Sequence, residues 1–204
     1  TVPYEVLKEC LFPVGGLRKP EVRDIAGVAN LPVVHKAESQ EICFVPANDY
    51  RRVIRKEAPE SLQEGEIVDE SGDKLGTHEG YAAFTVGQRR GLGIASSEPR
   101  YVVRTERETN RVVLGPRKSL LEDRFFISEM NWLQPRVPEI PLRCTVQIRH
   151  GGTPQSCSVQ LGMFEDQEMI EVQLDEPIFA IAAGQVAALY DDDVVLGGGW
   201  IEKS

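Results

Sequence analysis

A cysteine at position 43 raises the first chemical question about this chain. It lies inside the segment ESQEICFVP, residues 38–46, after a polar run and shortly before Pro46. If residues 41–45 form a buried strand, the thiol packs in a core, because free cysteine behaves as a small apolar side chain. If they form an exposed loop, the thiol can ionise and act as a nucleophile or a sulfur carrier. The pattern alone leaves both interpretations open.

The other three cysteines are predicted to be packing residues. Cys144 and Cys157 fall on the inferred inward faces of strands, and Cys10 lies beside leucines on an expected helix. No two cysteines form a CxxC motif, and none has a histidine at the spacing of a zinc site. We therefore expect no metal centre.

Basic residues that could bind phosphate occur in two places. The segment GQRRGLGI, residues 87–94, combines three glycines with Arg89 and Arg90. Its spacing is not GxGxxG, so a basic hairpin on a phosphate backbone is a better interpretation than a dinucleotide site, and a turn with two solvated arginines is the alternative. Arg149 and His150 close an expected strand, where arginine can bind phosphate and histidine can stack on an unpaired base.

The net charge of −9 opposes a nucleic-acid partner at first sight, but the charge is unevenly distributed. Residues 162–204 contain ten acidic side chains and one basic side chain, which accounts for the whole excess. Residues 87–118 contain eight basic and three acidic side chains. Because salt screens charges beyond about 10 Å, a local basic surface can still attract phosphate.

The elements that must position these residues begin with three short helices. They are predicted at residues 3–11, 20–29 and 49–57. Pro20 suits the first turn of the second helix, and Pro59 prevents the third from continuing.

Beyond residue 60 the apolar residues alternate, which is typical of strands. Hairpins are expected with turns at residues 71–72 and 109–110, and residues 134–141, with three prolines, are predicted as a linker before the later strands. Those strands are LRCTVQIR, SCSVQL, MIEVQL, QVAALY and VVLGGGWI, and they place Leu142, Cys144, Val146, Ile148, Cys157, Val159 and Leu161 on inward faces. Short strands at this spacing predict a small antiparallel barrel or sandwich.

The 204 residues allow one large domain or two to three small ones. No apolar run approaches the roughly 20 residues of a membrane span, and no secretion leader is seen, so we expect a cytoplasmic protein with reduced cysteines and no membrane partner. Because the first residue is Thr1 and not Met, we expect a piece of a longer protein.

Several long segments together resemble the bacterial tRNA-specific 2-thiouridylases (the MnmA type). These are LFPVGGLRKPEVR, ESQEICFVP, YAAFTVGQRRGLGI, NRVVLGPR and VVLGGGWIE, in the family's order over nearly the whole chain. The resemblance implies a mainly β chain: the tail of the catalytic domain with the cysteine loop at 1–58, a central β-rich domain at 59–122, and a C-terminal antiparallel β-barrel at 123–204.

The resemblance also implies a chemistry. ATP activates C2 of the wobble uridine, position 34, and Cys43 carries a persulfide whose sulfur goes to that carbon. The ATP-binding SGGxDS motif and the partner cysteine belong to an N-terminal domain that is not found here, so the chain alone is expected to be inactive. The implied partners are the tRNA anticodon arm and a sulfur-relay protein or cysteine desulfurase. The implied tRNA contacts are Arg149, Gln185 and His150, where the family usually has tyrosine.

Two other functions remain open from the residues. One is a non-catalytic RNA-binding barrel like those of translation factors, in which Cys43 is incidental. The other is a persulfide-carrier domain that does not bind RNA. Blocking Cys43 separates them, because RNA binding survives in the first case and sulfur acceptance is lost in the second.

Overall fold

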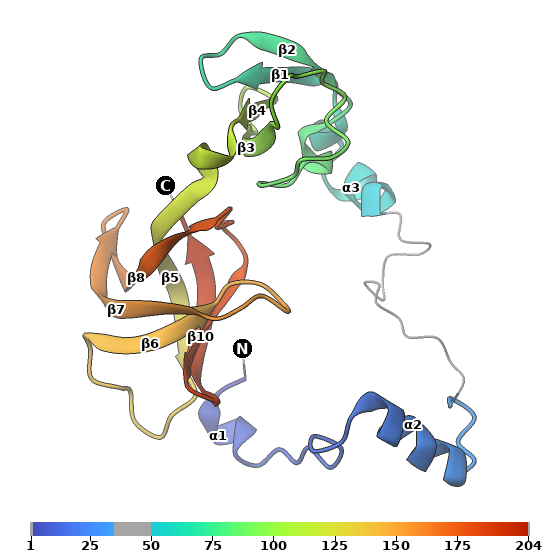
Figure 1. The fold of residues 1–204 in the computed structure, drawn as a ribbon, viewed down its shortest axis with the longest axis vertical. Helices are drawn as coiled ribbons and strands as arrows, with labels where there is room; N and C mark the ends of the chain where they lie inside the picture. The colour runs from blue at the N-terminus through green and yellow to red at the C-terminus, as the bar shows by residue number, and fades with distance from the viewer. Residues whose placement is uncertain (1, 35–49, 204) are drawn as a thin grey trace.

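The structure is a computed structural model, and it describes residues 2–34 and 50–203, with no side-chain description for residues 50–52. The described chain forms a four-stranded sheet and a closed six-stranded barrel, which lie in the upper and lower parts of Figure 1. This confirms the prediction of a mainly β protein with a short helical part at the front and an antiparallel barrel at the end.

The four-stranded sheet has the order β2-β1-β4-β3. Its strands are β1 (Gly65–Asp69), β2 (Lys74–His78), β3 (Tyr101–Glu106) and β4 (Arg111–Gly115). Both predicted hairpins are confirmed, because β1 pairs with β2 and β3 pairs with β4 in antiparallel register. The two hairpins join through a parallel pairing of β1 with β4, and the sheet's core consists of Ile67, Leu92, Val102, Val112 and Leu114.

Local chemistry explains both turns of this sheet. The side chain of Asp69 accepts hydrogen bonds from the backbone N–H groups of Ser71 and Asp73, and Gly72 supplies a φ of +91°. Asn110 adopts a φ of +51° in the second turn and donates its side-chain amide to the carbonyl oxygen of Glu64 at 2.9 Å. The second hairpin is thereby attached to the start of β1.

The barrel follows the order β10-β5-β8-β7-β6-β9, and β9 pairs with β10 to close it. Its strands are β5 (Leu121–Trp132), β6 (Leu142–Gln147), β7 (Gln155–Phe164), β8 (Gln167–Phe179), β9 (Val186–Asp191) and β10 (Val194–Glu202). The interior is apolar and includes Phe125, Ile127, Val146, Cys157, Val159, Val172, Leu189 and Ile201. Burial of these inward faces, repeated every second residue, stabilises the closed barrel.

The helices are α1 (Tyr4–Leu7), α2 (Lys19–Val28) and α3 (Tyr50–Glu57), and single 3-10 turns occur at η2 (Pro59–Leu62), η3 (Tyr81–Ala83) and η4 (Arg117–Leu120). The predicted helix over 3–11 is therefore too long. Neither α1 nor α2 has a buried residue, and short helices gain most of their stability from packing. The described helices are too short and too polar to cross a membrane.

Two predictions about packing and one about a linker are wrong. Cys10 is exposed rather than packed in a core, because its helix ends before it. Leu161 is 53% exposed, although it lies on the same face as Cys157 and Val159. The pairing of β6 with β7 ends at Val159, so β6 does not extend far enough to cover Leu161. The proline-rich stretch 134–141 is a loop within the barrel, because β5 before it is already a barrel strand.

Candidate functional site

Cys43, the predicted sulfur-accepting residue, lies outside the described residues. The other predicted site residues, Arg89, Arg90, Arg149, His150 and Gln185, are all described and all exposed. They come from three different connections of the fold, so the question is whether the fold brings them together.

Arg89 and Arg90 lie in the connection between β2 and β3. This segment is an irregular loop and not the predicted basic hairpin, because Gly87, Gly91 and Gly93 all adopt positive φ. The loop is nevertheless held firmly. The N–H of Gly87 donates to the carbonyl of Val102 at 2.8 Å, and the N–H of Val102 donates to the carbonyl of Gln88 at 3.0 Å.

Two further contacts orient the loop. The Gln88 side chain accepts from the backbone N–H of Thr85 at 3.0 Å and donates to the carbonyl of Arg90 at 2.9 Å. Leu92 is buried in the core of the four-stranded sheet. Arg89 and Arg90, earlier in the same loop, are exposed.

A cavity of about 410 Å³ lies along the same loop. Arg89 and Arg100 both line it, together with the backbone of Gly91 and Gly93, and Arg100 donates to the hydroxyl of Ser96 at 3.3 Å. Guanidinium groups beside glycine backbone favour an anionic ligand such as a phosphate group. Glu98 lines the cavity as well and partly offsets its positive charge.

Arg149 begins the turn after β6 and reaches across to the end of β8. Its Nη2 donates to the carbonyl of Phe179 at 3.1 Å and also to the carbonyl of Ala180. The turn is ordered by hydrogen bonds from the N–H of Gly152 to the Arg149 carbonyl, at 3.1 Å, and from the Gln147 amide to the Gly152 carbonyl, at 2.9 Å. His150 is exposed at this turn.

The same two residues, Phe179 and Ala180, form a joint between the barrel and the four-stranded sheet. A Cβ placed on Gly87 would lie 2.7 Å from the Cβ of Ala180 and 3.3 Å from the ring of Phe179. The Phe179 ring packs edge-on against Tyr101, with centroids 5.3 Å apart, and the guanidinium of Arg117 lies 4.9 Å from its centroid. The joint therefore holds both predicted basic loops, 87–94 and 149–152, against one short segment.

Gln185 lies at the far end of the connection that begins at this joint. Its backbone carbonyl accepts from the N–H of Ile201 at 2.7 Å, and its N–H donates to the carbonyl of Ala182. These bonds hold the backbone of Gln185, five residues after Ala180, and its side chain is exposed.

The residues of the joint were missed by sequence reasoning. Phe179, Tyr101 and Arg117 belong to three separate segments of the sequence. The one signal for the joint is the run IFAI, residues 178–181, whose consecutive apolar residues depart from the alternation of a strand. Of the ten acidic residues within 162–204, four lie in hairpin turns, Glu165, Asp166, Asp192 and Asp193, and the other six lie in strands. Among residues 2–34 and 50–203, no cluster of three or more His, Cys, Asp or Glu side chains could hold a metal ion.

The geometry predicts a structural role for Arg149. We expect Arg149→Ala to lower the free energy of unfolding by about 1–3 kcal/mol, because a charged donor to two carbonyl groups is lost, one of them on the fully buried Ala180. His150→Ala, at the next and exposed position, is the matched control and should leave stability nearly unchanged. Chemical denaturation of both variants measures this, and equal stability of the two would contradict the role given to Arg149.

Comparison with known proteins covers almost the whole chain. Residues 1–47 match the family described as the tRNA methyl transferase HUP domain, residues 51–116 the tRNA methyl transferase PRC-barrel domain, and residues 122–201 the aminomethyltransferase beta-barrel domain.

Curated relatives agree with these matches. A tRNA-specific 2-thiouridylase MnmA of Chloroflexus aggregans is 42% identical over 197 residues, 97% of this chain and 54% of the relative. Proteins of the same name from Geotalea uraniireducens and from Wolbachia of Brugia malayi are each 43% identical, over 100% and 97% of this chain and 53% and 52% of their own lengths. The chain thus spans about half the length of the curated relatives it matches. It belongs to the family of tRNA-specific 2-thiouridylases of the MnmA type.

Proposed function

We propose that the chain is part of a cytoplasmic tRNA 2-thiouridylase that places sulfur at C2 of the wobble uridine, position 34. Within the whole protein, this part would supply the sulfur-accepting cysteine and part of the tRNA-binding surface. The observation that carries the proposal is the identity of 42–43% to proteins of that name over 97–100% of the chain.

Cys43 is the residue to which we assign sulfur transfer. A thiolate can accept a sulfane sulfur from a donor persulfide, since the donor's S–S bond breaks as the new S–S bond forms. The donor would be a sulfur-relay protein or a cysteine desulfurase. Cys43 lies in the segment ESQEICFVP, and the resemblance of this segment to the family's cysteine segment supports the assignment.

The tRNA-binding surface would be built around the joint at Phe179 and Ala180. Arg89 and Arg90 would neutralise phosphates of the anticodon arm, because exposed guanidinium groups on a fixed loop bind phosphate oxygens well. His150 and Gln185 would contact bases near the target, by stacking and by hydrogen bonds. Arg149 would have two roles. Its hydrogen bonds to two carbonyl groups would anchor its own turn to the joint, and its exposed part would contact the RNA.

ATP would be bound outside this chain. The sequence has no SGGxDS segment, the motif that cradles phosphate in this family, and the match to the HUP domain covers only residues 1–47. We therefore assign no residue of this chain to ATP and derive no activation step from it.

A thiolation assay on the whole protein tests the proposal. The whole protein should be incubated with unmodified tRNA, ATP and a persulfide donor, and the tRNA digested to nucleosides for mass spectrometry. We expect 2-thiouridine that depends on both ATP and the donor, and none when residues 1–204 are supplied alone. Binding of tRNA without any 2-thiouridine would contradict the proposal and favour a non-catalytic RNA-binding barrel. Sulfur acceptance without tRNA binding would favour a persulfide carrier.

A further inference from the structure

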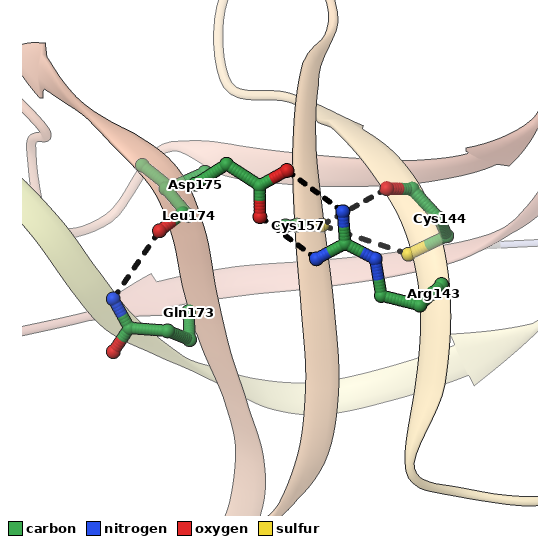
Figure 2. A network of polar contacts seen from close by, with 6 residues as sticks. All are labelled: Arg143, Cys144, Cys157, Gln173, Leu174 and Asp175. Atoms are coloured by element: carbon green, nitrogen blue, oxygen red, sulfur yellow. Dashed lines mark hydrogen bonds and ion pairs between the residues drawn. The ribbon is translucent and has the colours of Figure 1, made fainter.

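Two cysteines of the barrel face each other across neighbouring strands. Cys144 on β6 is the direct register partner of Cys157 on β7, and their sulfur atoms are 3.6 Å apart (Figure 2). From the sequence alone, the two are predicted to be separate packing residues. Their pairing is a property of the fold, and the thiolation chemistry proposed above does not use it.

The backbone around this pair already suits a disulfide. Directly opposed residues of antiparallel strands have Cα atoms about 4.5–5.5 Å apart, within the range of about 4.4–6.8 Å that a disulfide bridges. The sulfur atoms need to approach from 3.6 Å to a bond length of about 2.05 Å, which a small side-chain rotation can supply without a change of register.

The two thiols differ in access. Cys157 is completely buried in the barrel core, whereas Cys144 is only partly buried. Beside Cys144, the guanidinium of Arg143 makes a two-pronged ion pair with Asp175, with both hydrogen bonds at 2.7 Å (Figure 2). An external reagent therefore reaches the Cys144 thiol before the Cys157 thiol, near the guanidinium of Arg143.

The electrostatic environment favours the same order of reaction. The hydrogen bond from the Cys157 thiol lowers the pKa of Cys144, and the charge of Arg143 acts in the same direction, while burial and Asp191 oppose them. The hydrogen bond to Cys144 and burial both raise the pKa of Cys157, so Cys157 keeps its proton while Cys144 is a thiolate. Because Cys144 is the more accessible of the two, it is the attacking sulfur, and the buried Cys157 is the resolving one.

We propose that Cys144 and Cys157 form a redox-modification site, a dithiol that becomes an intramolecular disulfide by exchange with a small disulfide of the glutathione class. The Cys144 thiolate attacks one sulfur of the small disulfide, whose S–S bond breaks and releases a thiolate. Cys157 gives up its proton and attacks the Cys144 sulfur, and the second small thiolate leaves. Two protein thiols are oxidised, and one small disulfide is reduced to two thiols that take up the two protons.

The disulfide would close the stem of the hairpin that carries Arg149 and His150. The two cysteines are 13 positions apart and bracket that turn. A crosslink at the stem restricts how far β6 and β7 can separate. These two strands also pair with β9 and β8 respectively, so the crosslink lies between two further strands of the barrel. Oxidation would thereby stiffen the turn without touching either of its exposed side chains.

The experiment uses the full chain with the other two thiols removed, Cys10→Ser and Cys43→Ser. The native protein is incubated with excess oxidised glutathione, quenched with acid, denatured and alkylated, and then measured as an intact mass and as unreduced peptides. We expect the mass to fall by two hydrogen atoms, both alkylatable thiols to be lost, and a peptide pair that joins Cys144 to Cys157.

Single variants in the same background define each role. Cys157→Ala should trap one glutathione on Cys144, and Cys144→Ala should acquire none. If Cys157→Ala fails to fold, the peptide map of the parent still decides. A parent that keeps two alkylatable thiols, or that gains glutathione without an internal crosslink, would overturn the proposal.

Discussion

Cys43→Ser is expected to abolish 2-thiouridine formation by the whole protein, with a loss of at least about 1,000-fold. Serine matches cysteine closely in size, but its oxygen cannot hold a transferable sulfane sulfur, so the donor's persulfide has no acceptor. The proposed chemistry passes through this one atom, and therefore no partial activity should survive. Nucleoside mass spectrometry of tRNA after a timed reaction measures the loss.

Two controls separate chemistry from folding. Cys10→Ser changes an exposed thiol and should retain wild-type turnover. Cys144→Ser disturbs the edge of the barrel core, so it should lower stability more than turnover. Filter binding should show that Cys43→Ser still binds tRNA. Normal 2-thiouridine formation by Cys43→Ser would remove Cys43 from the reaction.

The double variant Arg89→Ala/Arg90→Ala is expected to weaken tRNA binding about tenfold or more at low salt. Each phosphate that an arginine neutralises releases condensed counterions, so the plot of log affinity against log salt should flatten by roughly one to two units. The loss should be similar for different tRNAs, because phosphate contacts carry no base information. Filter binding by the whole protein over a range of salt concentrations measures both quantities.

A matched charge control is available in the barrel. Arg124→Ala/Arg143→Ala removes the same net charge at positions where each guanidinium already pairs with a carboxylate, Glu171 and Asp175 respectively. This control should leave the salt slope nearly unchanged. If Arg89→Ala/Arg90→Ala kept the wild-type affinity and slope, the loop at 87–94 would be a solvated turn and would leave the proposed tRNA surface.

The local parts of this fold could be predicted from the sequence. Alternation of apolar residues located the strands except β5 (Leu121–Trp132), and turn residues such as Gly72 and Asn110 located both hairpins, since these signals act over a few residues. Residues predicted to face inward are buried where a neighbouring strand covers them, as at Val146 and Cys157. The prediction is wrong at Leu161, because the pairing of β6 with β7 has ended at Val159. The length of a strand is set by tertiary packing, which the local pattern does not contain.

The missing parts are those that depend on distant pairing. The parallel contact of β1 with β4 joins two hairpins whose separate patterns say nothing about each other. The joint at Phe179 and the facing sulfur atoms of Cys144 and Cys157 likewise arise only after the strands have found their neighbours. For the candidate site, residue types indicated Arg89 and Arg149, and Gln185 was implied by the family resemblance, but the segment that places them near one another could not be predicted.

Closure of the barrel has a consequence for how the protein is made. Its first strand, β5, pairs with its last, β10, for example Ile127 with Ile201. A ribosome synthesises the chain from its N-terminal end at roughly 5–20 residues per second. The four-stranded sheet is therefore complete once Gly115 has been made, whereas the edge of β5 that pairs with β10 is still unpaired. Until residues 194–202 have left the exit tunnel, β5 and β9 expose unpaired edges that invite aggregation. A nascent chain cut short by even its final strand would therefore be a natural substrate for chaperones and proteases.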